Sequence, residues 1–293
     1  MSDLVAVDVG SNAVRMKVAH WNGKELNCLY RTRSPIRLGA DVFKTGRISK
    51  QNARNLVDAF VEFRSLLDHN RNFKIRAVAT SAFREAKNAK YVKDWIYRTS
   101  KIRLEVIDFH KEATLIYKAV TKNLQNLKGN SVLMDIGGGS VEFIRFNSKG
   151  IQNKISLPLG TVRLLNRHHT LTGIQREIDE YRPMIRDFVF GSGDISQIVG
   201  TGGNFETFFS LKKNHFHGSN KARINLRQIH DIIAKLTMLT IEQRQKIYHM
   251  RADRADVIIP ALCVSQMFME ASGQTRILIP RVGLREGLIY DLI

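Results

Sequence analysis

Two segments of the chain combine an aspartate with a glycine-containing turn, a pairing suited to binding phosphate. Asp8 precedes Val9-Gly10-Ser11-Asn12, and Asp135 precedes Ile136-Gly137-Gly138-Gly139-Ser140-Val141-Glu142. Glycine lets the backbone approach an anion closely, and successive N–H groups of such a turn form an anion-binding concavity. A carboxylate beside the turn can hold hydrated Mg²⁺. Either turn could be an ordinary hairpin, but three consecutive glycines carry an entropic cost that close phosphate contact would explain.

A third glycine-rich segment, Gly200-Thr201-Gly202-Gly203-Asn204, lies between an expected strand over residues 195–199 and an expected helix. A strand-to-helix turn of this kind suits phosphate at the helix N-terminus. Asn204 could also be simply the helix N-cap. The candidate phosphate-binding residues of the three turns are Gly10, Ser11, Asn12, Gly137, Gly138, Gly139, Ser140, Gly202 and Gly203.

Two charged residues outside these turns are candidates for the chemistry itself. Arg84 follows an expected strand over 75–80, where its guanidinium could clamp phosphate with two hydrogen bonds. Glu112 begins an expected helix, where its carboxylate could polarise an attacking water molecule. Taken alone, the sequence favours a surface arginine at Arg84 and, at Glu112, a residue that complements the helix dipole.

The composition describes a basic globular protein. The 293 residues carry a formal net charge of +19. Such a field attracts polyanions, namely nucleic acid, an anionic membrane or a phosphate polymer, although it could also be a generally basic solvated surface. No apolar run approaches the roughly 20 residues of a membrane span. Two distant cysteines, Cys28 and Cys263, exclude a disulfide framework and a cysteine zinc site, so we expect a cytoplasmic location.

The hydrophobic pattern predicts a duplicated domain. The first half opens with a strand ending at an aspartate, a glycine turn, a second strand, a turn and a third strand, and this order recurs with the two aspartates 127 residues apart. A repeat at this spacing indicates two copies of a domain rather than a solenoid. The polar segment over 124–130 fits a linker, which predicts domains at 1–123 and 124–293. Ser49 is expected to cap a helix that runs to about residue 68.

Eight ordered segments resemble the signature segments of the exopolyphosphatase / guanosine pentaphosphate phosphohydrolase family. They occur in the order found in that family and extend over essentially the whole chain. The segments are Asp8–Asn12, Ala79–Asn88, Glu105–Tyr117, Asp135–Glu142, Leu157–Leu164, Gly200–Gly203, Arg254–Ile258 and Gly283–Gly287.

The resemblance implies an α/β, actin/hexokinase-like (ribonuclease H-like) fold with two lobes and an interdomain cleft. It implies that Glu112 is the catalytic base for water and that Arg84 binds phosphate. It further implies that Asp8, Asp135 and Glu142 line a site for Mg²⁺ (or Mn²⁺), with Asp135 also counted among the catalytic residues. The chain resembles the short, two-domain members, and homodimerisation is a further expectation of the resemblance.

Departures from the family pattern bear on activity. The residues before the base are Asp108-Phe109-His110-Lys111, where acidic residues are usual, so Lys111 is expected to favour ionised Glu112 and lower its basicity. Ala13 and Asn204 stand where hydroxyl residues are common. These differences concern the rate and the choice of substrate more than the fold.

The sequence therefore predicts a Mg²⁺-dependent exopolyphosphatase that hydrolyses the terminal phosphoanhydride of inorganic polyphosphate and releases orthophosphate. One alternative is 5′-phosphohydrolysis of guanosine pentaphosphate. Another is a catalytically weak regulator that binds polyphosphate or a nucleotide. We expect no membrane partner. Nucleic-acid binding is not expected either, because the sequence contains no recognised nucleic-acid-binding motif.

Overall fold

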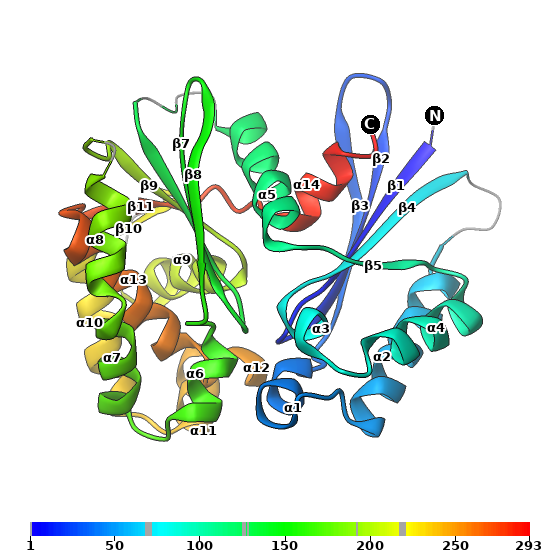
Figure 1. Cartoon of the computed structure of the whole chain (residues 1–293), viewed down its shortest axis with the longest axis horizontal. Helices are drawn as coiled ribbons and strands as arrows, with labels where there is room; N and C mark the ends of the chain where they lie inside the picture. The colour runs from blue at the N-terminus through cyan, green and yellow to red at the C-terminus, as the bar shows by residue number, and fades with distance from the viewer. Residues whose placement is uncertain (1, 68–71, 125–126, 128, 192, 217–220) are drawn as a thin grey trace. The chain divides into compact units, whose positions relative to one another are not determined.

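The computed structural model describes residues 2–67, 72–124, 127, 129–191, 193–216 and 221–293 (Figure 1). Contacts divide the chain into two compact units. Unit 1 comprises Met1–Ala119 and Val282–Ile293, and unit 2 comprises Val120–Arg281. The expected boundary at 123/124 differs from this division in two ways: the change of unit falls inside a helix, and the last twelve residues return to unit 1.

Unit 1 holds a five-stranded mixed sheet in the order β3-β2-β1-β4-β5. Strand β1 pairs antiparallel with β2 and parallel with β4. The elements are β1 (Ser2–Val9), β2 (Val14–Trp21), β3 (Leu26–Ser34), α1 (Leu38–Thr45), α2 (Lys50–Ser65), β4 (Phe73–Ala79), α3 (Ser81–Glu85), α4 (Ala89–Ser100), β5 (Leu104–Val106), α5 (Phe109–Asn123) and α14 (Leu284–Tyr290).

Unit 2 repeats this design in a six-stranded sheet with the order β10-β11-β9-β6-β7-β8. Strand β6 pairs antiparallel with β7 and parallel with β9, as β1 does with β2 and β4. The elements are β6 (Ser131–Ile136), β7 (Val141–Asn147), β8 (Gly150–Leu157), α6 (Thr161–Arg167), α7 (Leu171–Glu180), α8 (Arg182–Phe190), β9 (Gln197–Thr201), α9 (Gly203–His215), β10 (Arg223–Asn225), α10 (Leu226–Thr237), α11 (Ile241–Tyr248), α12 (Ala252–Ala255), α13 (Ile258–Ser272) and β11 (Arg276–Leu278).

The register of the central hairpins confirms the predicted duplication. Asp8 on β1 lies opposite Arg15 on β2, and Asp135 on β6 lies opposite Glu142 on β7. Each hairpin closes with the same backbone hydrogen bond, from Gly10 N to Ala13 O at 3.1 Å and from Gly137 N to Ser140 O at 3.0 Å. The two units are therefore copies of one actin-like α/β design, each with a loop at the same place.

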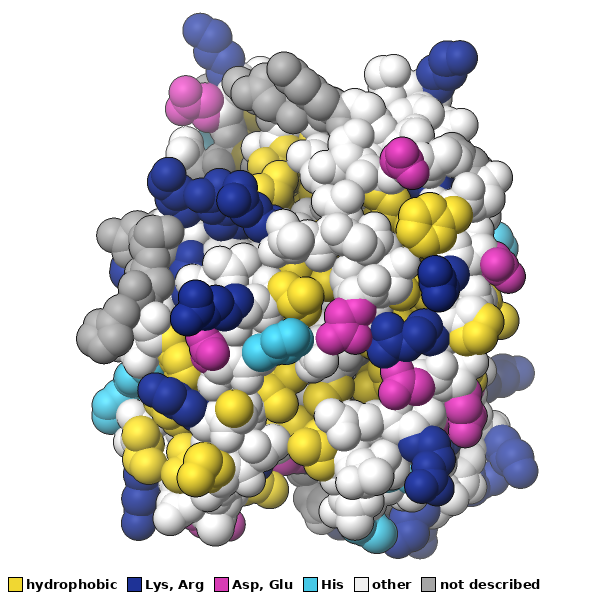
Figure 2. All heavy atoms as spheres, turned by 90° about the vertical axis from the view of Figure 1, so that its left-hand side faces the viewer, with side chains coloured by type: hydrophobic (Ala, Val, Ile, Leu, Met, Phe, Trp, Pro, Cys, Tyr) yellow, Lys and Arg dark blue, Asp and Glu magenta, His cyan; other side chains and the backbone are white. Residues whose placement is uncertain are grey.

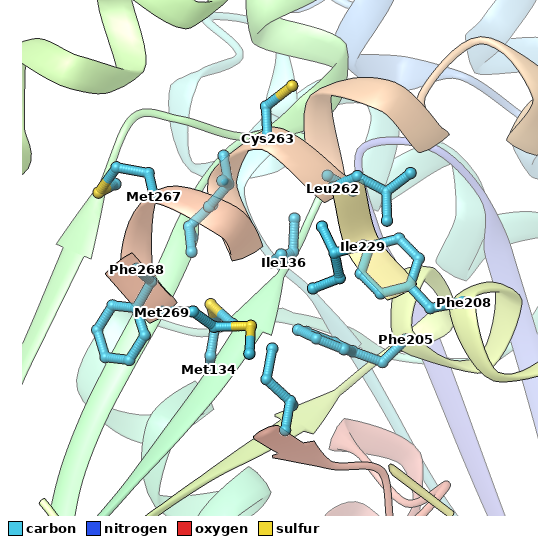
Figure 3. Close-up of a cluster of buried hydrophobic side chains, with 14 of the residues drawn as sticks. Met134, Ile136, Phe205, Phe208, Ile229, Leu262, Cys263, Met267, Phe268 and Met269 are labelled. Atoms are coloured by element: carbon cyan, nitrogen blue, oxygen red, sulfur yellow. The ribbon is translucent and has the colours of Figure 1, made fainter. Parts of the chain in front are cut away.

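Strand alternation separates core residues from site residues. In unit 2, Met134 and Ile136 lie in the hydrophobic core with side chains from α9, α10 and α13, as Figure 3 shows. Because successive side chains of a strand point to opposite faces, Asp135 between them lies on the other face. In unit 1, Val7 and Val9 lie in the core in the same way and leave Asp8 on the opposite face.

Helix α13 forms the centre of the unit 2 core. By length and composition, the stretch Ala252–Ser272 is the one candidate membrane span in the described part of the chain, but 83% of its apolar window is buried. Phe268 stacks on Phe143 of β7 with ring centroids 4.5 Å apart. This burial is typical of the core helix of a globular protein.

Several expected elements are longer, shorter or divided in the structure. Ser49 caps α2 as predicted, since its hydroxyl accepts a hydrogen bond from Asn52 N at 3.2 Å. Helix α2 ends at Ser65, and the expected end near residue 68 lies outside the described residues. The hydrophobic pattern alone predicts one helix over 81–100 and one over 173–188, whereas the structure has two helices in each stretch, α3 and α4 in the first and α7 and α8 in the second. The same pattern does not predict helices α1, α6, α11 and α14.

A buried ion pair holds α14 on the sheet of unit 1. Lys17 Nζ of β2 lies 2.9 Å from Glu286 Oε1, and Glu286 Oε2 accepts a hydrogen bond from Gly283 N at 2.9 Å. Both side chains are at least nine-tenths buried. Burial would raise the pKa of Glu286, but Lys17 and Arg285 outweigh it and hold that pKa below its usual value. The charge pair therefore couples the end of the chain to its first hairpin.

We predict that Lys17→Met destabilises unit 1 by about 3–5 kcal/mol, because it leaves a buried charge uncompensated. The double variant Lys17→Met/Glu286→Gln should recover most of that loss, since glutamine can still accept the bond from Gly283 N. Thermal melts at several pH values test this. A group with a lowered pKa stabilises the fold above its unfolded pKa and loses that contribution as pH falls through the folded pKa. The wild type should therefore lose more stability in acid than the double variant. Equal melting temperatures for wild type and Lys17→Met would contradict the prediction.

Candidate functional site

The first glycine turn lies at the carboxyl end of β1, beside the start of α3. Gly39 N, at the start of α1, donates to Ser11 O at 2.8 Å, and Arg37 Nε donates to Asn12 Oδ1 at 3.0 Å. Ser11 and Asn12 are both buried. The turn is thus held from outside by the segment that follows β3, which fixes its backbone for ligand binding.

Asp8 is a buried carboxylate with a cation as its neighbour. It is 7% exposed, and its Oδ2 lies 3.5 Å from Arg15 Nη1. Burial raises the pKa of Asp8, while Arg15 and Arg285 offset part of that rise. Arg15 occupies the position that Glu142 occupies in unit 2, so the carboxylate pair of unit 2 is replaced by an ion pair in unit 1.

Arg84 and Glu112 come together as the resemblance implied, but they contact each other directly. Arg84 Nη1 on α3 lies 2.8 Å from Glu112 Oε2 in the first turn of α5, and 3.1 Å from Ile107 O. Glu112 is 7% exposed. In the described part of the chain, Nε and Nη2 of Arg84 make no hydrogen bond, so donors remain for a phosphate.

Lys111, which is expected to act on the adjacent Glu112, contacts a different carboxylate. Lys111 Nζ lies 2.5 Å from Glu105 Oε1, a carboxylate on β5 that also lies near Arg76. This contact lowers the pKa of Glu105. Arg84 contacts Glu112, because α3 and the first turn of α5 meet at the carboxyl ends of β4 and β5.

In unit 2, the carbonyl groups of the triple-glycine loop are all engaged. Ile136 O accepts from Asn204 Nδ2 at 2.8 Å, and Ser140 O accepts from Gly137 N. The three glycine carbonyls accept from the first turn of α6. The donors are Thr161 N to Gly137 O at 3.0 Å, Val162 N and Arg163 N to Gly138 O at 2.9 and 3.1 Å, and Arg163 Nε to Gly139 O at 2.7 Å.

The N–H groups of the same loop remain available. In the described residues, the backbone N–H groups of Gly138, Gly139 and Ser140 donate to no protein acceptor. Because every carbonyl of the loop accepts a hydrogen bond from within the protein, three successive N–H groups remain available for an anion. Gly160 permits this arrangement, because a Cβ at that position would lie 2.2 Å from Gly139 C.

Asp135 and Glu142 form the carboxylate pair of unit 2. They lie directly opposite each other on β6 and β7, so their side chains share one face of the sheet. Ser140 Oγ and Ser156 Oγ lie 2.5 and 3.1 Å from Glu142 Oε1, which orients that carboxylate. Two carboxylates beside a phosphate loop suit Mg²⁺, which keeps several water ligands and takes few protein oxygens.

The third glycine turn lies against this pair. Gly202 has a φ of 86°, and a Cβ there would lie 2.4 Å from Asp135 Oδ1, so glycine is required on both counts. Gly202, not Asn204, is the N-cap of α9. Asn204 instead links the turns: it donates to Ile136 O and accepts from Arg254 Nη1 at 3.1 Å. The interpretation of Asn204 as the N-cap was wrong because the N-cap of α9 lies two residues earlier, at Gly202.

The number of carboxylates at each candidate site, and the charges next to them, decide how well that site fits a metal ion. The described residues contain no group of three or more His, Cys, Asp or Glu side chains that could hold an ion. Asp135 and Glu142 fit a Mg²⁺ site completed by water and substrate oxygens. Asp8 fits less well, because Arg15 already offsets its charge.

The sequence pattern indicates most residues of the candidate site, but it does not indicate the residues that support the glycine loops. No local sequence pattern reveals the contacts that support the loops. These contacts are made by Arg15, Gly160, Thr161 and Arg163. The segment Leu157–Leu164 is one of those that resemble a family signature. Its Gly-Thr pair before an apolar run is a local sign that α6 begins there.

Comparisons with known proteins agree over most of the chain. A model of the "Ppx/GppA phosphatase family" matches residues 16–293. Exopolyphosphatase 1 of Mycobacterium tuberculosis is 27% identical, covering 98% of this chain and 87% of that protein. The bifunctional 3-dehydroquinate synthase/phosphatase of Fusobacterium nucleatum is 25% identical over 94% of this chain, and the chain spans only 44% of that protein's length.

A solved structure matches as well. The crystal structure of an exopolyphosphatase from Cytophaga hutchinsonii has a TM-score of 0.89 and 25% sequence identity, and the match covers 99% of this chain and 97% of that one. The family model alone covers far more than half of the chain, in agreement with the duplicated actin-like fold. The chain therefore belongs to the Ppx/GppA phosphatase family.

Proposed function

We propose that this phosphatase is an exopolyphosphatase, which hydrolyses the terminal phosphoanhydride bond of inorganic polyphosphate and releases orthophosphate. The observation that carries the proposal is the Gly137–Ser140 loop, whose carbonyls are all engaged and whose N–H groups are left for an anion, beside the Asp135–Glu142 pair. Relatives named exopolyphosphatase support the choice of substrate.

The proposed reaction is an in-line displacement at phosphorus. The oxygen of a water molecule forms a bond to the terminal phosphorus as the bond to the bridging oxygen breaks. Glu112 accepts the proton of the water, and the shortened chain leaves with a new terminal oxygen. Backbone N–H groups and Arg84 stabilise the negative charge on the transferring group.

We propose Mg²⁺ (or Mn²⁺) as the cofactor, held by Asp135 and Glu142. When bound, the ion offsets charge on the phosphate oxygens. Without the ion, the two carboxylates would repel the polyanionic substrate. The presence of this carboxylate pair therefore supports a bound cation in the active enzyme. Ser140 and Ser156 orient Glu142 for this role.

Guanosine pentaphosphate is the second candidate substrate, since the family name covers both activities. The same residues would remove its 5′-terminal phosphate. The alternative of a weak regulator was based on His110 and Lys111 next to Glu112, and the Lys111 side chain contacts Glu105. We therefore favour turnover over binding alone.

We predict that Glu112→Gln lowers kcat for polyphosphate about 10²–10⁴-fold with little change in KM, because the amide cannot accept the proton. Orthophosphate release from polyphosphate and from guanosine pentaphosphate measures this. Glu105→Gln is the matched control, since this exposed carboxylate lies on the neighbouring strand and contacts Lys111. If the Glu112 variant keeps wild-type kcat, the base is another group. A higher kcat/KM for guanosine pentaphosphate in the wild type would favour the second substrate.

We predict that Arg84→Met both raises KM and lowers kcat, since it removes a phosphate ligand and the partner of Glu112. Arg84→Lys should recover only part of the loss, because an ammonium cannot contact Glu112, Ile107 O and a phosphate with the geometry of a guanidinium. Steady-state kinetics on both variants, with guanidinium added to the methionine variant, tests this. A rise in KM alone would show that Arg84 binds phosphate without acting on the base.

We predict that EDTA abolishes activity and that Asp135→Asn and Glu142→Gln each raise the Mg²⁺ concentration for half-maximal rate at least tenfold. Direct Mn²⁺ binding, followed by electron paramagnetic resonance without substrate, should weaken in parallel. Asp187→Asn, an exposed acidic residue on α8 of the same unit, is the control. Unchanged Mn²⁺ affinity in both carboxylate variants would exclude this pair as the metal site.

A further inference from the structure

Thr201, the last residue of β9, has a buried hydroxyl without a hydrogen-bond partner in the described part of the chain. The residue is 1% exposed. Polar side chains on the surface, such as the basic and acidic ones that Figure 2 shows interspersed on one face, are solvated by water instead. A buried polar group without a partner costs free energy, so the position of this hydroxyl needs a physical explanation.

Strand register places Thr201 beside Asp135. Strand β9 pairs in parallel with β6, and Asp135 and Thr201 are partners in that pairing. Ile198 and Phe205 belong to the hydrophobic core, and a Cβ at Gly200 would lie 2.4 Å from Cδ1 of Phe205, which Figure 3 shows in that core. Since successive side chains of a strand alternate between faces, Thr201 lies on the other face, the one that carries Asp135.

This face of the unit 2 sheet carries a row of polar residues from four neighbouring strands. Asp135 is paired with Glu142 on β7, and Glu142 is paired with Ser156 on β8. At one end of the row, Ser156 Oγ lies 3.1 Å from Glu142 Oε1, so a hydroxyl orients that carboxylate. Thr201 has the corresponding place at the other end of the row, next to Asp135.

The Asp135 carboxylate lies against the turn that follows Thr201. A Cβ at Gly202 would lie 2.4 Å from Asp135 Oδ1. Carboxylates that bind metal ions in proteins commonly accept hydrogen bonds as well, and these bonds fix their orientation. Thr201, adjacent to Gly202 in the chain, carries a hydroxyl that can donate such a bond.

Unit 1 shows that the strand does not require a hydroxyl at this position. In the equivalent pairing, Asp8 on β1 is the partner of Val78 on β4, which is fully buried. Valine has the shape of threonine, with a methyl group in place of the hydroxyl. The carboxylate of Asp8 has Arg15 as its neighbour, whereas Asp135 has a second carboxylate. The hydroxyl is therefore found in the unit that has the carboxylate pair, and packing alone does not explain it.

We propose that Thr201 is a positioning residue for the metal site: its hydroxyl donates a hydrogen bond to the Asp135 carboxylate when that carboxylate binds a divalent cation. The inference rests on the proposed function, in which Asp135 and Glu142 hold Mg²⁺ or Mn²⁺. Because the hydroxyl has no partner among the described residues of the fold, this bond adds to cation binding and not to folding.

The variant Thr201→Val tests this separation, because it replaces the hydroxyl by a methyl group. Its melting temperature in EDTA should equal or exceed that of the wild type, since no hydrogen bond of the fold is lost. Mn²⁺ binding without substrate, followed by electron paramagnetic resonance, should weaken about tenfold. Thr201→Ser keeps the hydroxyl and should stay within about threefold of the wild type.

Thr237→Val is the matched control. Thr237 lies on α10 of the same unit, and its hydroxyl donates to Ile233 O at 3.0 Å. This variant should leave the Mn²⁺ affinity unchanged. Equal weakening of Mn²⁺ binding in Thr237→Val and Thr201→Val would overturn the proposal.

A double-variant cycle tests whether Thr201 acts through Asp135. In an Asp135→Ala background, Thr201→Val should weaken Mn²⁺ binding much less than in the wild type, because the accepting carboxylate is already absent. Full additivity of the two changes would overturn the proposal. So would a lower melting temperature of Thr201→Val in EDTA, which would show that the hydroxyl has a partner in the fold itself.

The same measurements separate this inference from the proposed function. Mn²⁺ binding that depends on Asp135 and Thr201, in a protein that releases no phosphate from polyphosphate, would refute the proposed function and support the role of Thr201. Wild-type Mn²⁺ affinity in Thr201→Val, with weaker binding in Asp135→Ala, would overturn the role of Thr201 alone. A higher KM for polyphosphate in Thr201→Val at unchanged Mn²⁺ affinity would assign the hydroxyl to the substrate and would overturn it too.

Discussion

The engagement of every carbonyl from Ile136 to Ser140 is the constraint on which the rest of the site depends. A flexible triple-glycine loop could present either carbonyl oxygens or N–H groups to a ligand. Of these, only N–H groups attract phosphate. Helix α6 and Asn204 remove the first option by donating to the carbonyls. Gly160 is glycine because α6 has to start in contact with the loop. The fold thus leaves the N–H groups of this loop, and not its carbonyl oxygens, available to a ligand.

The duplicated hairpins show how one scaffold supports two different electrostatic sites. At equivalent positions, unit 1 has Asp8 opposite Arg15, and unit 2 has Asp135 opposite Glu142. The first pair is near neutral and the second is doubly negative when ionised. The pair in unit 2 therefore suits the cation proposed above, whereas the pair in unit 1 already balances its own charge. The difference between arginine and glutamate at one position of the repeated hairpin accounts for this contrast.

The contact between Arg84 and Glu112 joins the two residues to which we assign phosphate binding and proton transfer. A guanidinium that contacts the carboxylate through one nitrogen still has donors for a phosphate. The same side chain can therefore orient the base and attract the group to be hydrolysed. The departure at Lys111 has no direct contact with Glu112, because that lysine extends to Glu105 on the neighbouring strand.

The sequence by itself determined the duplication, the two aspartate–glycine turns and the central strands, because strand alternation and glycine turns are local patterns. It also identified Glu112 and Arg84 as candidates, though not that they touch. Tertiary structure alone decided which groups support the loops. Arg163, Gly160 and Asn204 act on residues 20 or more positions away, and residues 282–293 return to unit 1 through the Lys17–Glu286 pair. Such contacts depend on strand order and helix packing, which hydrophobic periodicity does not encode.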